Sequence, residues 1–142
     1  MAEQGKIDEA IDSYREEIRQ DPTNHFAYTD LATLFARKGA NGEARRHFEA
    51  ALKLVPDFEH AHLNLAILLT REEEYEEAAA HAREVLRLNP GRQPVHTALG
   101  LILKKQGKIE ESILHFTEAA RLKPEDPVAK KNLQEALAER KQ

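Results

Sequence analysis

Hydrophobic residues recur along this chain at spacings of three and four positions, within segments that are otherwise polar or charged. Because an α-helix completes a turn in about 3.6 residues, this spacing places the hydrophobic side chains on one face of a helix. Strong helix formers dominate these segments, and glycine and proline, six of each, interrupt them. The pattern predicts an all-α protein of short amphipathic helices joined by brief connections.

The interruptions recur at a fixed interval. The phrases IRQDP, LKLVP, LRLNP and ARLKP end at four equally spaced prolines, which are Pro22, Pro56, Pro90 and Pro124. Hydrophobic positions keep the same interval, as in the series Leu31, Leu65, Leu99 and Leu133. A series of small residues keeps this interval, namely Ala44, Ala78 and Ser112. Four residues after each of them comes a second series, Phe48, Ala82 and Phe116, in which two of the three residues are large. Each period is therefore predicted to hold two closely packed helices.

Turn signals divide each period in two. Gly39, followed by Asn41-Gly42, predicts a helix stop and a turn, and Gly107 predicts another. The middle period has Glu73 at the corresponding position, so its turn is less strongly specified.

A helix–turn–helix period of about 34 residues with small, aromatic and proline positions resembles the tetratricopeptide repeat (TPR) family. The resemblance covers essentially the whole chain and implies a right-handed superhelical solenoid of about eight antiparallel helices. It describes residues 1–142 as a single array: 3–22 as the second helix of a truncated repeat, 25–58, 59–92 and 93–126 as complete repeats, and 127–142 as a C-terminal capping helix. The family's usual tryptophan position holds Tyr28, His62, His96 and Lys130.

The two ends of the array carry separate predictions. The first helix lacks its partner helix, so its apolar residues are expected to be incompletely covered: Ile7, Ile11, Tyr14 and Ile18. That uncovered face would allow association with a second copy of the chain. Asp126 and Pro127 are typical of a helix start, as N-cap and first-turn proline, and the polar helix that follows would cap the array.

Composition narrows the classes of function. The 142 residues include 41% hydrophobic and 32% charged residues, with a formal net charge of −4, which is typical of a folded protein and not of a nucleic-acid binder. The sequence has no cysteine and no apolar run long enough to span a membrane, and its first residues, MAEQGKIDEAI, lack the basic start and apolar core of a signal peptide. No direct membrane insertion is expected, and a cytoplasmic location is favoured for the chain as written.

In the TPR family, the first helix of each repeat lines a concave groove that binds peptides. The resemblance therefore implies a peptide-binding surface formed by Phe26, Thr29, Asp30, Thr33, Arg37, His60, Leu63, Asn64, Ile67, Arg71, Thr97, Leu101, Lys104 and Lys105. Asn64 resembles the family asparagine that contacts peptide backbone with its amide.

One basic residue per period follows the same register, namely Arg37, Arg71 and Lys105, with Lys104 beside the last. A row of cations would favour an acidic or carboxylate-bearing peptide. The alternative is that each cation lies in the last turn of its helix, where it complements the helix dipole.

Catalytic and metal sites are not indicated. The chain has no cysteine, two serines and no glycine-rich phosphate loop, so neither catalytic residues nor cofactors are predicted. Among seven histidines, His47, His81 and His115 recur at the interval of the prolines. Neighbouring repeats would hold them about 10 Å apart, too far to share a metal.

Three functions agree with these observations. The leading hypothesis is a non-catalytic scaffold that binds a peptide or protein segment in the concave groove. The second is a substrate-recruiting segment of a larger enzyme, such as a protein O-linked glycosyltransferase or a membrane transferase. The third is a self-assembly module that acts through the uncovered first helix.

Overall fold

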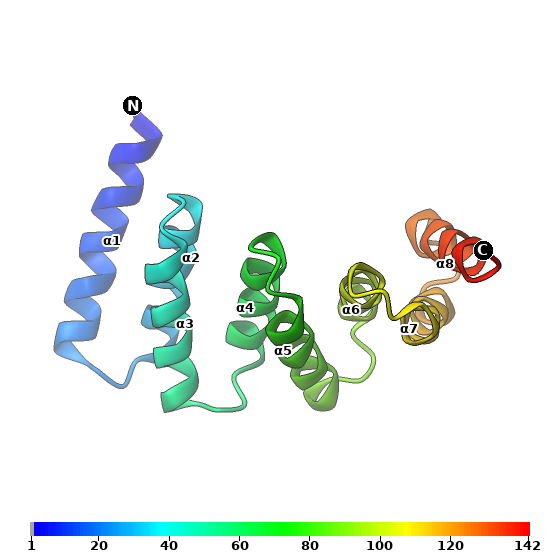
Figure 1. Ribbon diagram of the computed structural model, residues 1–142. Helices are drawn as coiled ribbons and strands as arrows, with labels where there is room; N and C mark the ends of the chain where they lie inside the picture. Colours follow the sequence, from blue (N-terminus) through cyan, green and yellow to red (C-terminus); the bar gives the residue numbers. More distant parts are fainter. Residues whose placement is uncertain (1) are drawn as a thin grey trace. The chain divides into compact units, whose positions relative to one another are not determined.

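The computed structural model describes residues 2–142, and this part of the chain forms eight α-helices and no strand (Figure 1). In chain order they are α1 (Ala2–Gln20), α2 (His25–Arg37), α3 (Asn41–Leu54), α4 (Glu59–Arg71), α5 (Tyr75–Leu88), α6 (Gln93–Lys105), α7 (Ile109–Leu122) and α8 (Pro127–Arg140). None of the eight helices is long and apolar enough to cross a membrane. The predicted all-α helical repeat is confirmed.

The helix boundaries repeat with the sequence. The starts of α2, α4, α6 and α8 are equally spaced, and the starts of α3, α5 and α7 keep the same interval. The four recurrent prolines lie in the connections that precede α2, α4, α6 and α8, because proline cannot continue the helix before it. Asp126 is the N-cap of α8, where its carboxylate accepts a hydrogen bond from the Val128 amide at 3.0 Å, and Pro127 follows it, as predicted. The side chain of Asn24 caps α2 in a similar way.

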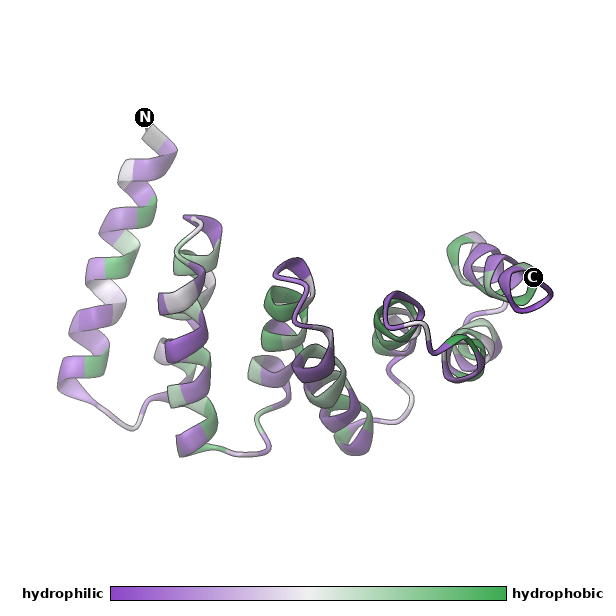
Figure 2. Ribbon diagram, in the orientation of Figure 1, coloured by the Kyte–Doolittle hydropathy of each residue, from purple (hydrophilic) through white to green (hydrophobic). Residues whose placement is uncertain are grey.

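Contacts divide the chain into two compact units, one ending at Leu68 and the other beginning at Leu69, so that the boundary lies within α4. In the first unit α1 packs against α2, and α2 packs against α3. Hydrophobic and hydrophilic residues are interleaved along the helices of this unit (Figure 2). The buried hydrophobic residues of the unit are Ile7, Ile11, Ala27, Leu31, Ala32, Phe35, Ala44, Phe48, Ala51, Ala61, Leu65, Ala66 and Leu68.

In the second unit α6 packs against both α5 and α7, and α7 packs against α8. Phe116, which is fully buried, lies at the centre of a cluster with Ile113 and Ala136, with Ile109, Leu133 and Leu137 around it. Gly100 allows the close approach of α6 to α7, because a Cβ at this position would lie 2.6 Å from the Phe116 ring. The predicted alternation of small and large positions therefore corresponds to the packed interior.

The turn inside each period uses one residue in the left-handed region, and the three residues occupy corresponding positions of the repeat. Gly39 has φ of 82° and Gly107 has φ of 78°, and Glu73 adopts φ of 62° at the corresponding position. The prediction that Asn41-Gly42 belongs to the first turn is wrong, because these residues begin α3. One left-handed residue is sufficient to reverse the chain, and the carbonyl of Ala40 already accepts the first helical hydrogen bond of α3, from the Ala44 amide at 3.0 Å.

The prediction that the apolar face of α1 is incompletely covered is wrong for Ile7 and Ile11, which are 8% and 3% exposed. They are buried because α1 packs directly against α2. Tyr14 and Ile18 are half-buried, as predicted.

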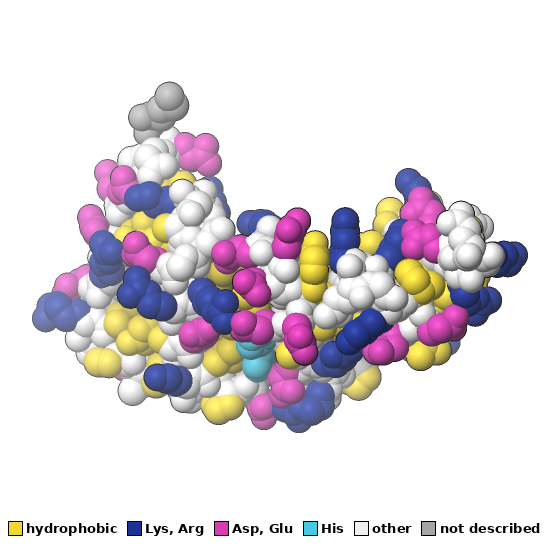
Figure 3. All heavy atoms as spheres, in the orientation of Figure 1, with side chains coloured by type: hydrophobic (Ala, Val, Ile, Leu, Met, Phe, Trp, Pro, Cys, Tyr) yellow, Lys and Arg dark blue, Asp and Glu magenta, His cyan; other side chains and the backbone are white. Residues whose placement is uncertain are grey.

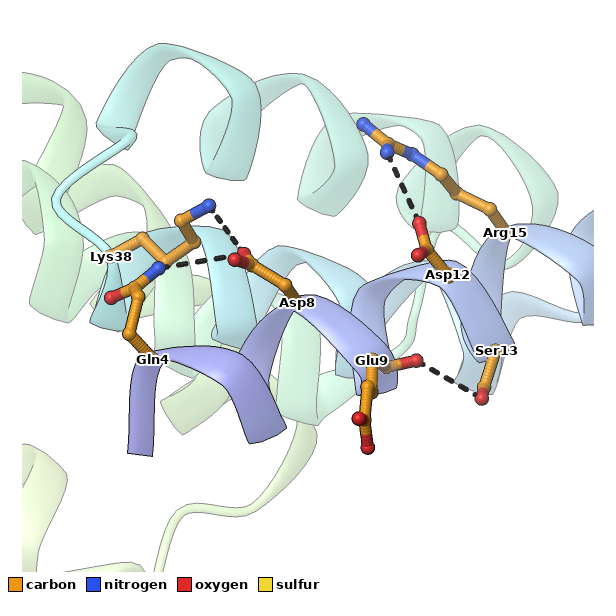
Figure 4. Close-up of polar contacts among 7 residues, drawn as sticks. All are labelled: Gln4, Asp8, Glu9, Asp12, Ser13, Arg15 and Lys38. Atoms are coloured by element: carbon orange, nitrogen blue, oxygen red, sulfur yellow. Dashed lines mark hydrogen bonds and ion pairs between the residues drawn. The ribbon is translucent and has the colours of Figure 1, made fainter. Parts of the chain in front are cut away.

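Charged residues also connect α1 to the end of α2. The Lys38 ammonium donates to the Asp8 carboxylate at 2.7 Å, and Gln4 donates to the same carboxylate from the preceding turn (Figure 4). The hydrogen bond from Lys38 lowers the pKa of Asp8 below its usual value. A second ion pair joins Arg37 to Glu3 at 3.3 Å.

Candidate partner-binding surface

An aromatic cluster lies at the N-terminal ends of α2 and α4. The Phe26 ring meets the Phe58 ring edge to face, with centroids 5.4 Å apart and planes at 85°. His25 contacts Phe58 in the same manner at 4.8 Å, and His60 lies 6.0 Å from Phe58. Phe26 is 60% exposed although it is a large hydrophobic residue, so most of its ring is available to a partner.

Phe58 brings together two residues that the sequence assigned to the peptide-binding surface, Phe26 and His60. Neither Phe58 nor His25 was predicted. A signal for Phe58 was present, because an aromatic residue two positions after Pro56 lies in a connection, where it is not needed for the interior.

The exposed face of α4 continues from His60. Asn64 and Ile67 follow it at helical spacing, and Ile67 is 43% exposed. Leu63 is half-buried beside them. The Asn64 amide donates one hydrogen bond to the His60 carbonyl at 3.0 Å, which directs the side chain along its own helix.

Thr29 is not available to a ligand, so its prediction as a contact residue is wrong. It is 1% exposed, and its hydroxyl donates to the His25 carbonyl at 2.9 Å. A helical threonine commonly forms this bond to its own backbone. Thr33 is half-buried and forms the equivalent bond to the Thr29 carbonyl at 3.0 Å. Asp30 is exposed, and the pKa of nearby Tyr14 is raised by burial and further by the charge of Asp30.

In the second unit, the predicted contact residues of α6 lie at successive turns of one helix face. Thr97 is half-buried, Leu101 is 42% exposed and Lys105 is exposed. The Thr97 hydroxyl donates to the Gln93 carbonyl at 3.4 Å. Leu101 therefore forms the apolar part of this face and Lys105 its charged end.

The basic row is partly neutralised by local ion pairs. Arg37 pairs with Glu3, as described above, and Lys104 lies 3.0 Å from Glu139 and 3.9 Å from Glu135 of α8. Within residues 2–142, neither Arg71 nor Lys105 forms an ion pair. Arg37, Arg71 and Lys105 are the last residues of α2, α4 and α6, which is where a cation complements the helix dipole.

Basic and acidic side chains are interspersed over the face of the molecule shown in Figure 3, with hydrophobic side chains between them. No single sign of charge dominates that face. Among the described residues, no group of three or more histidine, cysteine, aspartate or glutamate side chains is arranged to hold a metal ion.

Comparison with protein families connects this arrangement of helices to a known group. The family of the middle TPR-like domain of cilia and flagella-associated protein 70 matches residues 1–123. The chain belongs to this family. No curated protein sequence matches the chain significantly.

Several solved structures are similar to this TPR-like domain. One is MamA, residues 41 to the end, from Desulfovibrio magneticus RS-1, with a TM-score of 0.89 and 21% sequence identity. The match covers 99% of this chain and 79% of the MamA chain. PilF of Pseudomonas aeruginosa has a TM-score of 0.84 and 22% identity, with coverage of 99% and 64%. YrrB, a TPR protein with an unusual peptide-binding site, has a TM-score of 0.85 and 19% identity, with coverage of 99% and 72%. At these identities the similarity shows the fold, and the predicted TPR resemblance is confirmed.

Proposed function

We propose that this TPR-like domain is a non-catalytic interaction module that binds a segment of a protein partner. TPR-like folds are consistent with protein-interaction scaffolds. The observation that carries the proposal is the exposure of Phe26, 60%, within a cluster of four aromatic rings. A rigid, exposed aromatic side chain supplies a large contact area at a small cost in conformational entropy.

The proposed contact surface of the first unit consists of Phe26, Phe58, His60, Asn64 and Ile67. The rings of Phe26 and Phe58 hold each other in an edge-to-face arrangement, so a partner would not have to order them on binding. Asn64 and Ile67 add an amide and an apolar side chain on the next turns of α4. A peptide with an apolar anchor residue suits this surface. YrrB, which shares the fold, is described as having a peptide-binding site.

The second unit presents its own proposed surface on α6, formed by Leu101 and Lys105. Lys105 and Arg71 are the members of the basic row without an ion pair in the described part of the chain, so an acidic partner would be attracted mainly by these two residues. Arg37 and Lys104 would contribute less, because a partner would have to compete with Glu3 and Glu139.

The proposal is tested by selecting peptides that bind the immobilised chain from a diverse library and then measuring their affinity for variants. Phe26→Ala is expected to weaken binding about tenfold or more, which is the effect of removing a central aromatic contact. Leu114→Ala is the matched control, because Leu114 is 69% exposed on α7, which contributes nothing to the aromatic cluster. Circular dichroism of each variant verifies that the helices are intact.

Selection of no peptide, or equal affinities for Phe26→Ala and the parent, would remove the basis for this surface. If Phe26→Ala retains binding and Leu101→Ser loses it, the binding surface belongs to α6. Loss of affinity in Lys105→Glu, together with recovery by a peptide of opposite charge, would identify the partner as acidic.

A further inference from the structure

Two histidines that lie 19 residues apart in the sequence meet between α6 and α7. The Nδ1 atoms of His96 and His115 are 3.2 Å apart, and the rings are stacked, with centroids 5.4 Å apart and planes at 28°. The Nε2 atom of His96 lies 2.8 Å from the carbonyl oxygen of Pro90. His96 is 8% exposed, and His115 is half-buried.

These contacts determine where the protons are. The Pro90 carbonyl can only accept a hydrogen bond, so Nε2 of His96 must carry a hydrogen. In neutral His96 the Nδ1 atom is then an acceptor, and the bond between the rings is donated by Nδ1–H of His115. The contact between the two rings therefore contains a single proton.

The pair can take up two further protons, one on each ring. The first would bind Nε2 of His115 and place a positive charge in a half-buried position. The second would have to bind Nδ1 of His96, which would direct two N–H groups at each other and place two positive charges side by side. The second step cannot occur without separation of the rings.

The charged groups around the pair come from two helices, α5 and α7. Burial lowers the pKa of His115, and the neighbouring His96 and the Arg83 guanidinium of α5 lower it further, whereas Glu111 and Glu118 of α7 raise it. Both carboxylates are already engaged by arginines, since Arg83 donates to Glu111 at 3.3 Å and Arg121 pairs with Glu118. Their ability to compensate a histidinium is therefore reduced.

We infer that His96 and His115 form an acid-sensitive latch that holds α6 against α7 when the pair is neutral and releases this contact as both rings become protonated. The Pro90 carbonyl extends the latch to the connection before α6. Unfolded histidines bind protons near about pH 6.5, whereas the folded pair cannot hold both added protons while its rings stay in contact, so the unfolded state binds more protons below that pH. The stabilisation is complete above about pH 6.5 and is lost as the pH falls through the lower pKa of the folded state.

The first repeat of the same chain offers a matched comparison. Tyr28 and His47 occupy the positions that correspond to His96 and His115, and their rings lie 6.4 Å apart. This pair contains only one imidazole, so its two rings cannot both become positively charged. His96→Tyr therefore recreates an arrangement that the fold already contains and removes the latch.

The test combines ring NMR with unfolding. In the parent chain, nitrogen-detected NMR should show His96 as the Nε2–H tautomer at neutral pH, and His115 should become protonated at a lower pH than a histidine of the unfolded chain. The unfolding equilibrium constant should rise severalfold between about pH 7.5 and pH 5.5, with an upper limit of about tenfold per histidine for each pH unit below the unfolded pKa. His96→Tyr should reduce that rise.

Protonation of His115 at the same pH as a histidine of the unfolded chain would overturn the inference, and so would an undiminished pH dependence in His96→Tyr. The NMR titration uses the parent chain alone, so it remains decisive if the variant folds poorly. Neither measurement involves a binding partner, so the result is independent of the proposed scaffold function.

Discussion

The ring of Phe116 occupies the space that a side chain at Gly100 would need, with its Cε1 atom 2.6 Å from an ideal Cβ position. Phe116 is fully buried and belongs to the cluster that joins α7 to α8. Its ring therefore has little room to move.

Gly100→Ala is expected to destabilise the protein by about 1–2 kcal/mol, because the cost of overpacking exceeds the gain of about 1 kcal/mol in helix propensity. Chemical denaturation measures the change. Gly42→Ala is the control, since a Cβ at this helical position meets nothing within 4 Å, and it should stabilise the chain. Equal effects of the two substitutions would show that the ring moves aside freely.

Glu73→Gly is expected to raise the free energy of unfolding by about 0.5–1 kcal/mol, because a non-glycine residue in the left-handed region carries a steric cost that glycine lacks. Glu73 has φ of 62°, and glycine is already present at the corresponding positions 39 and 107. Thermal unfolding provides the measurement. The neighbouring Glu72→Gly, where φ is not positive, should not stabilise, and stabilisation by both variants would point to relief of charge repulsion instead.

Asp126→Ala is expected to cost about 1–2 kcal/mol, since it removes the N-cap of α8 and a side-chain partner at the same time. The Asp126 carboxylate accepts from the Val128 amide and also from the side chain of Gln93, at 3.1 Å. Gln93 is 7% exposed, so water cannot easily replace the lost bond. Asp126→Asn keeps an oxygen for the cap but replaces the oxygen that accepts from Gln93, so it should lose less stability than Asp126→Ala in the same denaturation experiment.

Lys38→Met is expected to increase hydrogen exchange in α1 more than in α2, because it removes the ion pair with Asp8. The same exchange should rise in the parent chain under acid conditions. The pKa of Asp8 is lowered by its bond to Lys38, so this stabilisation is present above the ordinary aspartate pKa and is lost as the pH falls through the lower folded value.

Ser13→Ala is the control for this experiment, since the Ser13 hydroxyl donates to the Glu9 carbonyl of its own helix, at 3.1 Å. An acid response of α1 that persists unchanged in Lys38→Met would assign it to another group.

The repeat was predictable because periodic packing leaves a periodic record in the sequence. Leu31, Leu65 and Leu99 share a register, and all three are at most 1% exposed. The burial of Ile7 was not predictable in the same way, because it depends on how closely α1 approaches α2.

The candidate site was less accessible to sequence reasoning. Thr29 follows the same helical spacing as its exposed neighbours, and only its bond to the His25 carbonyl reveals that the hydroxyl is already satisfied. His96 and His115 occupy different positions of the repeat, so they do not belong to one series of histidines spaced a full period apart. Their contact therefore leaves no periodic signal in the sequence.

The coincidence of the helix boundaries with the sequence period has a consequence for the gene. An unequal crossover that removes or adds one full period joins a helix end to the same kind of connection, in the same phase, as before. Repeat number can therefore change in a single genetic event while every junction remains well formed, whereas a deletion that ends in the middle of a helix leaves that helix incomplete.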